Sequence, residues 1–240
     1  MLSFLYIVFL AIFIIIYVIC CVFARFFTNK SVVNICCVSI IFLCYVFTVI
    51  YVYNQVGFDD WNFKNTLPTA NVSPFMFATC PIFFILPKSI RKYFALLISL
   101  LSIGMFLSPI ISSIYFFSIG YKFHPSFLPD YFAHFVLSFW GVYLVISKQV
   151  ELKIKNSLIA GSIIVSVAII MMILNVIFDK SFFGLSLNGK HTIYNNVIVS
   201  NSYLSALLYF TGLIVVLISG YFYQKLILSL KRKHSYSCVE

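Results

Sequence analysis

Long apolar stretches alternate with short polar connections along the whole chain. We place seven such stretches at residues 2–23, 32–53, 73–87, 93–117, 131–147, 157–178 and 202–224. A helix needs about 20 mainly apolar residues to cross the roughly 30 Å hydrocarbon core of a bilayer, and most of the stretches reach that length. The pattern predicts an all-α fold, a polytopic transmembrane bundle of seven helices that forms one domain over residues 1–240.

Basic residues distinguish the two sides of this bundle. The connections after the second, fourth and sixth stretches hold only Lys64, Lys122, Lys180 and Lys190. Lys and Arg accumulate in cytoplasmic loops, so the sequence predicts an N-terminus outside and a C-terminus in the cytoplasm of a cell membrane. The other connections and the C-terminal tail hold 12 of the 16 basic residues, namely Arg25, Lys30, Lys88, Arg91, Lys92, Lys148, Lys153, Lys155, Lys225, Lys231, Arg232 and Lys233.

Composition supports the prediction of a transmembrane protein and limits the partners that we expect. Hydrophobic residues make up 62% of the chain and charged residues 9%, and the mean hydropathy is +1.07, which excludes a soluble globular domain. The formal net charge of +10 sits beside lipid headgroups, so the expected partner is the lipid bilayer and not nucleic acid. No Cys/His ligand spacing occurs, and we predict no metal or cofactor.

Helix-breaking residues mark the third and fourth stretches. The third stretch is short and holds Pro74, Pro81 and Pro87, while the fourth holds Gly104 and Pro109. Proline inside a helix removes a backbone donor and kinks or breaks the helix. Broken helices persist at membrane depth where protein or a water-filled cavity satisfies the backbone, so we expect these two stretches to line a cavity.

Asp130 and His134 form the sharpest candidate site. They are four residues apart and share one helix face, with His134 about one turn into the membrane. A titratable side chain at that depth is costly and commonly functional, so His134 is a candidate general base that Asp130 would orient. The alternative is structural: Asp130 follows Pro129 and caps the fifth helix, and His134 bonds a neighbouring helix.

Two hydroxyls lie at the same predicted depth as His134. Thr69 and Ser73 are at the outer end of the third stretch, and either is a candidate nucleophile. The alternative for Ser73 is that it caps the third helix, with Pro74 in the first turn. Cys80 lies deeper and is expected to be a small buried hydrophobe.

Three further polar residues are candidate substrate contacts near the outer face. Trp61 follows two acidic residues and is typical of an interfacial anchor. Asn175 lies near the outer end of the sixth stretch, where it can pair across helices or contact a lipid headgroup. Asp179 opens the longest outer connection, which extends to Asn201 and is either a solvated loop or a headgroup-binding surface.

The order of these residues resembles the YwaF family of bacterial integral membrane proteins. Leu67-Pro68 precedes a short stretch that bears a serine, and His134 lies in Ala-His-Phe-Val-Leu-Ser-Phe-Trp-Gly-Val-Tyr-Leu-Val. Asn175 begins Asn-Val-Ile-Phe-Asp-Lys-Ser-Phe-Phe-Gly. The resemblance covers roughly residues 60–220. The family is related to an animal transmembrane acyltransferase that remodels ether phospholipids, so the resemblance implies acyl transfer on a membrane lipid.

The chain departs from the family at the reactive position. In the family a His and then a Cys follow the Leu-Pro pair, whereas here Ala70 stands in place of the His and Val72 in place of the nucleophilic Cys. His134 matches the second His of the family. Three interpretations follow: Ser73 or Thr69 replaces the thiol, the protein is an inactive member, or the alignment does not hold.

The sequence favours the transfer or hydrolysis of an acyl chain near the outer leaflet, with a phospholipid or acyl lipid as substrate. A small-molecule or lipid transporter, in which the kinked third and fourth helices line a cavity, is the alternative. A receptor without catalysis is a weaker fit, because the loops are short.

Overall fold

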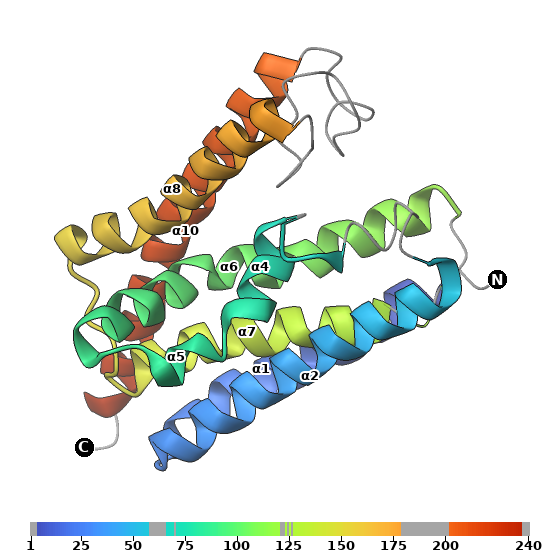
Figure 1. The fold of residues 1–240 in the computed structure, drawn as a ribbon. Coiled ribbons are helices and arrows are strands. Elements are labelled where there is room, and N and C mark those ends of the chain that lie inside the picture. The colour runs from blue at the N-terminus through green and yellow to red at the C-terminus, as the bar shows by residue number, and fades with distance from the viewer. Residues whose placement is uncertain are drawn as a thin grey trace.

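The computed structural model of the protein describes residues 4–57, 66–69, 71–120, 123, 125, 127–178 and 202–236. All regular structure in these residues is helical (Figure 1). The helices are α1 (Phe4–Phe23), η1 (Ala24–Phe26), α2 (Lys30–Val56), α4 (Val72–Thr79), α5 (Ile82–Ile85), α6 (Lys88–Ser118), α7 (Phe127–Ile146), α8 (Ile154–Phe178) and α10 (Ser202–Tyr236).

Six of the described helices are long and apolar enough to cross a membrane: α1 with η1, α2, α6, α7, α8 and α10. The protein is therefore an all-α, multi-pass membrane protein, as predicted. Local chemistry explains where these helices begin and end. The Asn29 side chain accepts a hydrogen bond from the Val32 backbone amide at 3.2 Å and caps α2. Gly57 ends α2 with a φ of +78°, a conformation that glycine adopts without steric cost.

The predicted third stretch forms two short helices. α4 ends at Thr79 and α5 begins at Ile82, so the chain breaks at Cys80 and Pro81 as the proline predicted. At 1.5 Å per residue, residues 72–85 cover roughly 20 Å even if fully helical, which is short of the hydrocarbon thickness. By contrast, α6 continues through Gly104 and Pro109 as one helix, so the fourth stretch is not broken.

Contacts between helices establish their relative directions. Ser113, late in α6, hydrogen-bonds Tyr131, early in α7. Gly141, late in α7, lies against Ser102 in the middle of α6. These two helices are therefore antiparallel. Asn34, near the start of α2, bonds Trp140 and Gln149 at and beyond the far end of α7, so α2 is also antiparallel to α7. α2 and α6 thus run in the same direction. The short helices α4 and α5 lie between α2 and α6 in the chain.

α6 and α7 form the centre of the bundle, and glycines permit the close packing. A Cβ atom at Gly141 would lie 2.8 Å from the Ile98 carbonyl oxygen, and one at Gly220 of α10 would overlap the Leu100 carbonyl oxygen. The α6 segment from Ile98 to Ser102 is therefore held between α7 and α10. Small residues at helix contacts are characteristic of membrane bundles, where van der Waals packing replaces the hydrophobic effect between helices.

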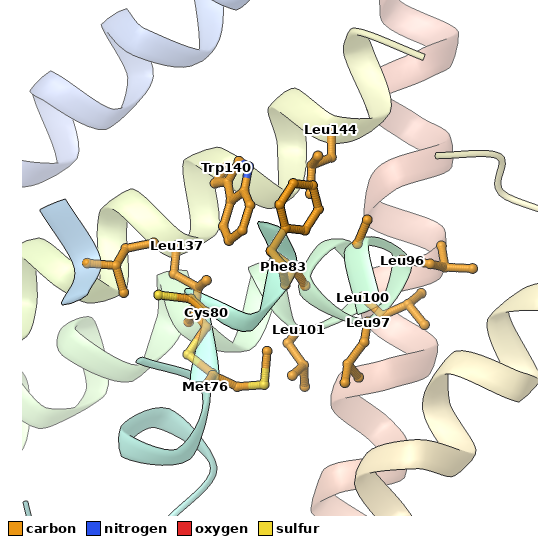
Figure 2. Packing of buried hydrophobic residues seen from close by; sticks show 14 of the residues in the cluster. Met76, Cys80, Phe83, Leu96, Leu97, Leu100, Leu101, Leu137, Trp140 and Leu144 are labelled. Atoms are coloured by element: carbon orange, nitrogen blue, oxygen red, sulfur yellow. The ribbon is translucent and has the colours of Figure 1, made fainter. Parts of the chain in front are cut away.

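The core also includes the short helices. Met76, Cys80 and Phe83 project from the α4–α5 segment toward Leu137 and Trp140 of α7 (Figure 2). The Phe83 and Trp140 rings meet edge to face, with centroids 5.1 Å apart. Cys80 is fully buried among these side chains, which confirms its prediction as a small core residue.

Large apolar side chains cover the outside of the bundle. They come mainly from α1, α2, α8 and α10 and include Ile15, Leu43, Leu158, Ile177 and Phe222. A soluble protein rarely exposes apolar surface on this scale, whereas lipid chains solvate it in a membrane. The exposed faces of these four helices therefore face lipid.

Candidate functional site

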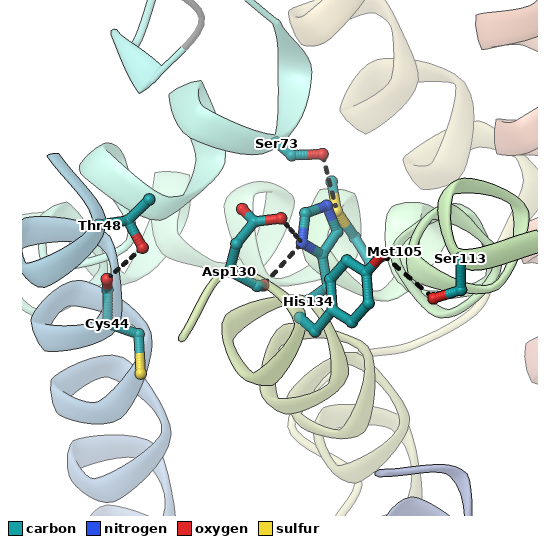
Figure 3. Close-up of polar contacts among 8 residues, drawn as sticks. Cys44, Thr48, Ser73, Met105, Ser113, Asp130 and His134 are labelled. Atoms are coloured by element: carbon teal, nitrogen blue, oxygen red, sulfur yellow. Dashed lines mark hydrogen bonds and ion pairs between the residues drawn. The ribbon is translucent and has the colours of Figure 1, made fainter. Parts of the chain in front are cut away.

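His134 lies on the buried face of α7, and its side chain is only 6% exposed. Its Nδ1 is 2.9 Å from the backbone carbonyl oxygen of Asp130 and 3.6 Å from Oδ2 of the Asp130 carboxylate (Figure 3). The predicted pairing of these two residues on one helix face is therefore observed. The principal contact is to the backbone carbonyl, and the carboxylate lies just outside hydrogen-bond distance.

This contact determines which imidazole nitrogen is available. Both oxygens of Asp130 that approach Nδ1 are acceptors, so Nδ1 carries the proton and donates it in the neutral ring. Nε2 then keeps its lone pair. No hydrogen bond to Nε2 is present among the residues that the structure describes. The arrangement suits a general base that takes a proton at Nε2.

Asp130 does not cap α7 at its start. The helix begins at Phe127, four residues before the predicted stretch at 131, so Asp130 lies inside the first turn. A carboxylate in the first turn still interacts favourably with the helix dipole. Its side chain is 36% exposed, so the rest of the bundle covers it only in part.

Ser73 lies in the first turn of α4. Phe77, one turn further along α4, packs perpendicular to the His134 ring with centroids 4.8 Å apart. α4 and α7 are therefore in contact. The Ser73 hydroxyl donates to the Met105 sulfur of α6 at 3.5 Å, so its hydrogen bond in this structure goes to α6 and not to His134.

The cap of α4 is Asn71, so the alternative interpretation that Ser73 caps this helix is wrong. The Asn71 side chain accepts from the Val72 backbone amide at 2.7 Å. Ser73 is the second residue of the helix, and Pro74 lies in its first turn as expected. Because it is not needed as the cap, the Ser73 hydroxyl is free to point toward α6.

The other predicted site residues divide by location. Thr69 lies in a turn before α4 and is partly buried. Asn175 is 2% exposed near the end of α8, so it is a buried polar side chain rather than a headgroup contact at the surface. Trp61 and Asp179 lie outside the described residues.

Several residues around His134 were not anticipated. Met105 and Phe77 border Ser73 and His134. The Ser113 hydroxyl donates to the Tyr131 hydroxyl at 3.1 Å in the same half of α7 (Figure 3). This half, residues 127–136, is called the outer half below, after its place in the predicted topology. Tyr131 immediately follows Asp130, so its position beside the candidate site could have been inferred. Met105 and Phe77 are apolar residues in apolar helices, and no sequence signal distinguishes them from other core residues.

The other half of α7, residues 137–146, is called the inner half below, and it carries a second polar cluster that the sequence did not single out. The Trp140 indole N–H donates to Oδ1 of Asn34 at 3.0 Å, and Asn34 Nδ2 donates to Oε1 of Gln149 at 2.8 Å. Gln149 Nε2 in turn donates to the Ser147 hydroxyl at 2.8 Å. A lone Asn in an apolar stretch, such as Asn34, is the signal that could have revealed it.

Comparisons with known proteins identify no relative. No family model matches the sequence, no curated protein is similar to it, and no solved structure matches the fold.

Proposed function

We propose that this membrane protein transfers or hydrolyses an acyl chain of a membrane lipid near the outer leaflet, as a YwaF-like protein. The supporting observation is the state of His134: its Nδ1 is oriented by Asp130, while Nε2 has no hydrogen-bond partner among the described residues. A buried imidazole at membrane depth with one available nitrogen is a functional site by default.

The proposed reaction uses Ser73 as the nucleophile. The Ser73 hydroxyl rotates from Met105 toward Nε2 of His134, attacks the ester carbonyl of the lipid and passes its proton to Nε2. His134 then returns this proton to the leaving alcohol as the acyl-serine forms. Water or a second lipid hydroxyl takes the acyl group from the serine. Catalytic hydrogen bonds commonly tighten only when substrate is bound, so the Ser73–Met105 contact is compatible with this route.

Thr69 is the alternative nucleophile, and substitution distinguishes it from Ser73. If Ser73 carries the acyl group, Ser73→Ala abolishes labelling by a fluorophosphonate probe and Thr69→Ala leaves it intact. The reverse result assigns Thr69. Absence of labelling in the native protein contradicts a serine or threonine nucleophile.

A binding or transport protein, or an inactive family member, is the second candidate. The Ser73–Met105 hydrogen bond and the aromatic packing of Phe77 on His134 favour it, because both hold the candidate groups in non-reactive contacts. Uptake of lipid analogues by proteoliposomes without any change in acyl composition would support this candidate.

We also propose seven crossings, with the N-terminus outside and the C-terminus in the cytoplasm of the cell membrane. The parallel course of α2 and α6 supports a return crossing by the α4–α5 segment, and the 12-to-4 distribution of basic residues supports the orientation. A C-terminal reporter should be cytoplasmic, and a tag between Asp179 and Asn201 should be accessible from outside. A cytoplasmic tag at that position would reverse the orientation.

A further inference from the structure

A groove of about 590 Å³ opens between α1, α7 and α10, away from His134. It lies on the half of the bundle where α1 and α7 end. Its walls are mostly aliphatic and include Val18, Val22, Val142, Ile146 and Ile227. Aliphatic walls suit an acyl chain, and the groove differs from a simple lipid-facing surface because Tyr17, Tyr223 and Arg25 are also among its lining residues.

At its deep end the groove reaches a chain of hydroxyls. The Ser138 hydroxyl donates to the Tyr17 hydroxyl at 3.1 Å, and the hydroxyls of Tyr17 and Tyr223 are 2.9 Å apart. This chain joins α1, α7 and α10 and fixes the end wall of the groove. Tyr17 is 6% exposed, so this part of the wall is buried.

At its open end the groove is lined by Arg25 of η1. Tyr17 and Arg25 are eight residues apart, which places them roughly 12 Å apart along the helix axis. The Arg25 guanidinium lies 4.8 Å from the centre of the Phe26 ring and is exposed. This stacking holds the cation at the mouth of the groove.

Arg25 has no carboxylate partner among the described residues. The ion pairs there are His134 with Asp130 and Lys153 with Glu151. An apolar channel that ends at an unpaired guanidinium is complementary to an amphiphile with an anionic head. Arginine also binds phosphate oxygens with two parallel hydrogen bonds, which suits a phosphodiester head.

We propose that this groove binds one acyl chain of an anionic phospholipid, whose phosphate contacts Arg25. The bound lipid belongs to the leaflet at the η1 end of the bundle, which is the cytoplasmic leaflet in the orientation proposed above. The site does not depend on the reaction proposed at His134.

A second groove provides a natural control. It has a volume of about 530 Å³ and lies between α8 and α10, with Leu158, Gly161, Leu217 and Phe222 among its lining residues. No basic residue lines it. Lys153, which precedes α8, is paired with Glu151 at 2.7 Å. The two grooves are therefore similar in size. They differ in that a basic side chain, Arg25, lines the first groove, whereas Lys225 stacks on the Tyr221 ring beside the second groove without lining it.

The test measures lipid retention by native mass spectrometry. The delipidated full-length protein is titrated with phosphatidylglycerol or phosphatidylcholine of the same acyl chains. We expect one phosphatidylglycerol to be retained in preference to phosphatidylcholine. Arg25→Gln should reduce that retention about fivefold, since a basic residue near an anionic lipid surface contributes about that factor.

Matched variants make the result specific. Lys92→Gln removes an exposed basic residue outside both grooves and should leave retention unchanged. Val22→Trp fills the groove from an exposed position of α1 and should abolish retention, whereas Leu158→Trp fills the control groove and should not. His134→Gln should also have no effect, which separates this site from the proposed reaction.

Three outcomes would overturn the proposal. Equal retention of the two lipids indicates annular lipid only. Equal losses in Arg25→Gln and Lys92→Gln indicate a general charge effect. Displacement of phosphatidylglycerol by equimolar palmitate indicates a fatty-acid site. Circular dichroism of each variant confirms that it is folded before its retention is compared.

Discussion

The two halves of α7 both carry buried polar side chains, and they differ in how completely those side chains are hydrogen-bonded. In the inner half, Trp140 bonds Asn34, and the Tyr143 hydroxyl donates to the Phe27 carbonyl oxygen at 2.9 Å. In the outer half, only one nitrogen of the His134 imidazole has a partner among the described residues. A hydrogen-bonded polar group holds helices together, whereas an ionisable side chain at membrane depth is a functional candidate.

The two halves of α7 also differ in the helices against which they pack. The inner half packs against the α6 segment that Gly141 and Gly220 approach closely. The outer half packs against α4, a helix of eight residues that ends at a break. In the reaction proposed above, this half supplies the base and α4 supplies the nucleophile.

The largest expected effect comes from the glycine contacts of the inner half. Gly220→Ala places a methyl group on the Leu100 carbonyl oxygen, and Gly141→Ala places one against Ile98 and Ser102. Both should destabilise the bundle by about 1–3 kcal/mol or more, because the helices must separate. Gly212→Ala in α10 is the control, since a Cβ there meets nothing within 4 Å. Thermal unfolding in detergent measures the three, and equal melting temperatures would contradict the close packing.

Trp140 tests the polar network of the inner half with a smaller change. Trp140→Phe keeps an aromatic ring against Phe83 and removes the N–H donated to Asn34. Interhelical hydrogen bonds in membranes contribute about 0.6–2 kcal/mol, so stability should fall by that amount while any activity persists. The double variant Trp140→Phe/Asn34→Leu, compared with each single variant, measures the coupling between the two side chains. A coupling of zero would mean that the network does not hold α2 to α7.

Ser73 should show the opposite behaviour in the outer half. Ser73→Ala removes only a weak hydrogen bond to the Met105 sulfur, so the free energy of unfolding should change by less than about 0.5 kcal/mol. Acyl transfer should nevertheless be lost if Ser73 is the nucleophile. Ser73→Cys, which restores the thiol type of the resembled family one position further along, is the informative companion. A large fall in stability with unchanged activity would make Ser73 structural.

The smallest effect is expected at the surface pair of Glu151 and Lys153. The hydrogen bond from Lys153 lowers the pKa of the Glu151 carboxyl below its ordinary value of 4.5. Its contribution to stability is therefore present above pH 4.5 and is lost as the pH falls through the lowered pKa. Both side chains are exposed, so Lys153→Gln should leave the melting temperature at pH 7 unchanged. A clear fall at pH 7 that disappears at pH 3 would show that the pair matters.

The hydrophobic pattern alone predicted most of the helices of the fold. Six of the seven predicted stretches correspond to long helices, with ends that differ by a few residues except for α10, which continues to Tyr236. Periodicity locates apolar helices well but not their ends, because polar residues extend a helix once it leaves the membrane. The third stretch differs because Pro81 interrupts it, and composition alone could not say whether the result would be a kink or a break.

The candidate site was only partly predictable. The spacing of Asp130 and His134 gave their shared face, since i and i+4 residues are neighbours on any helix. The spacing could not predict that the Asp130 backbone carbonyl is the closer partner of His134 Nδ1, because that depends on the His134 rotamer. The sequence also could not predict the hydrogen bond from Ser73 to Met105, because that contact joins residues 32 positions apart. Such contacts arise from packing and have no local signal.

The most direct test of the outer-half site is acyl release in proteoliposomes that contain a labelled phospholipid. His134→Gln preserves size and polarity and removes the base. The native protein should release or transfer the label, and His134→Gln should be slower by about 10²–10⁴-fold with an unchanged melting temperature. Equal rates for the two proteins, or a variant that loses stability while the native protein shows no reaction, would contradict a catalytic His134 and make it a packing residue.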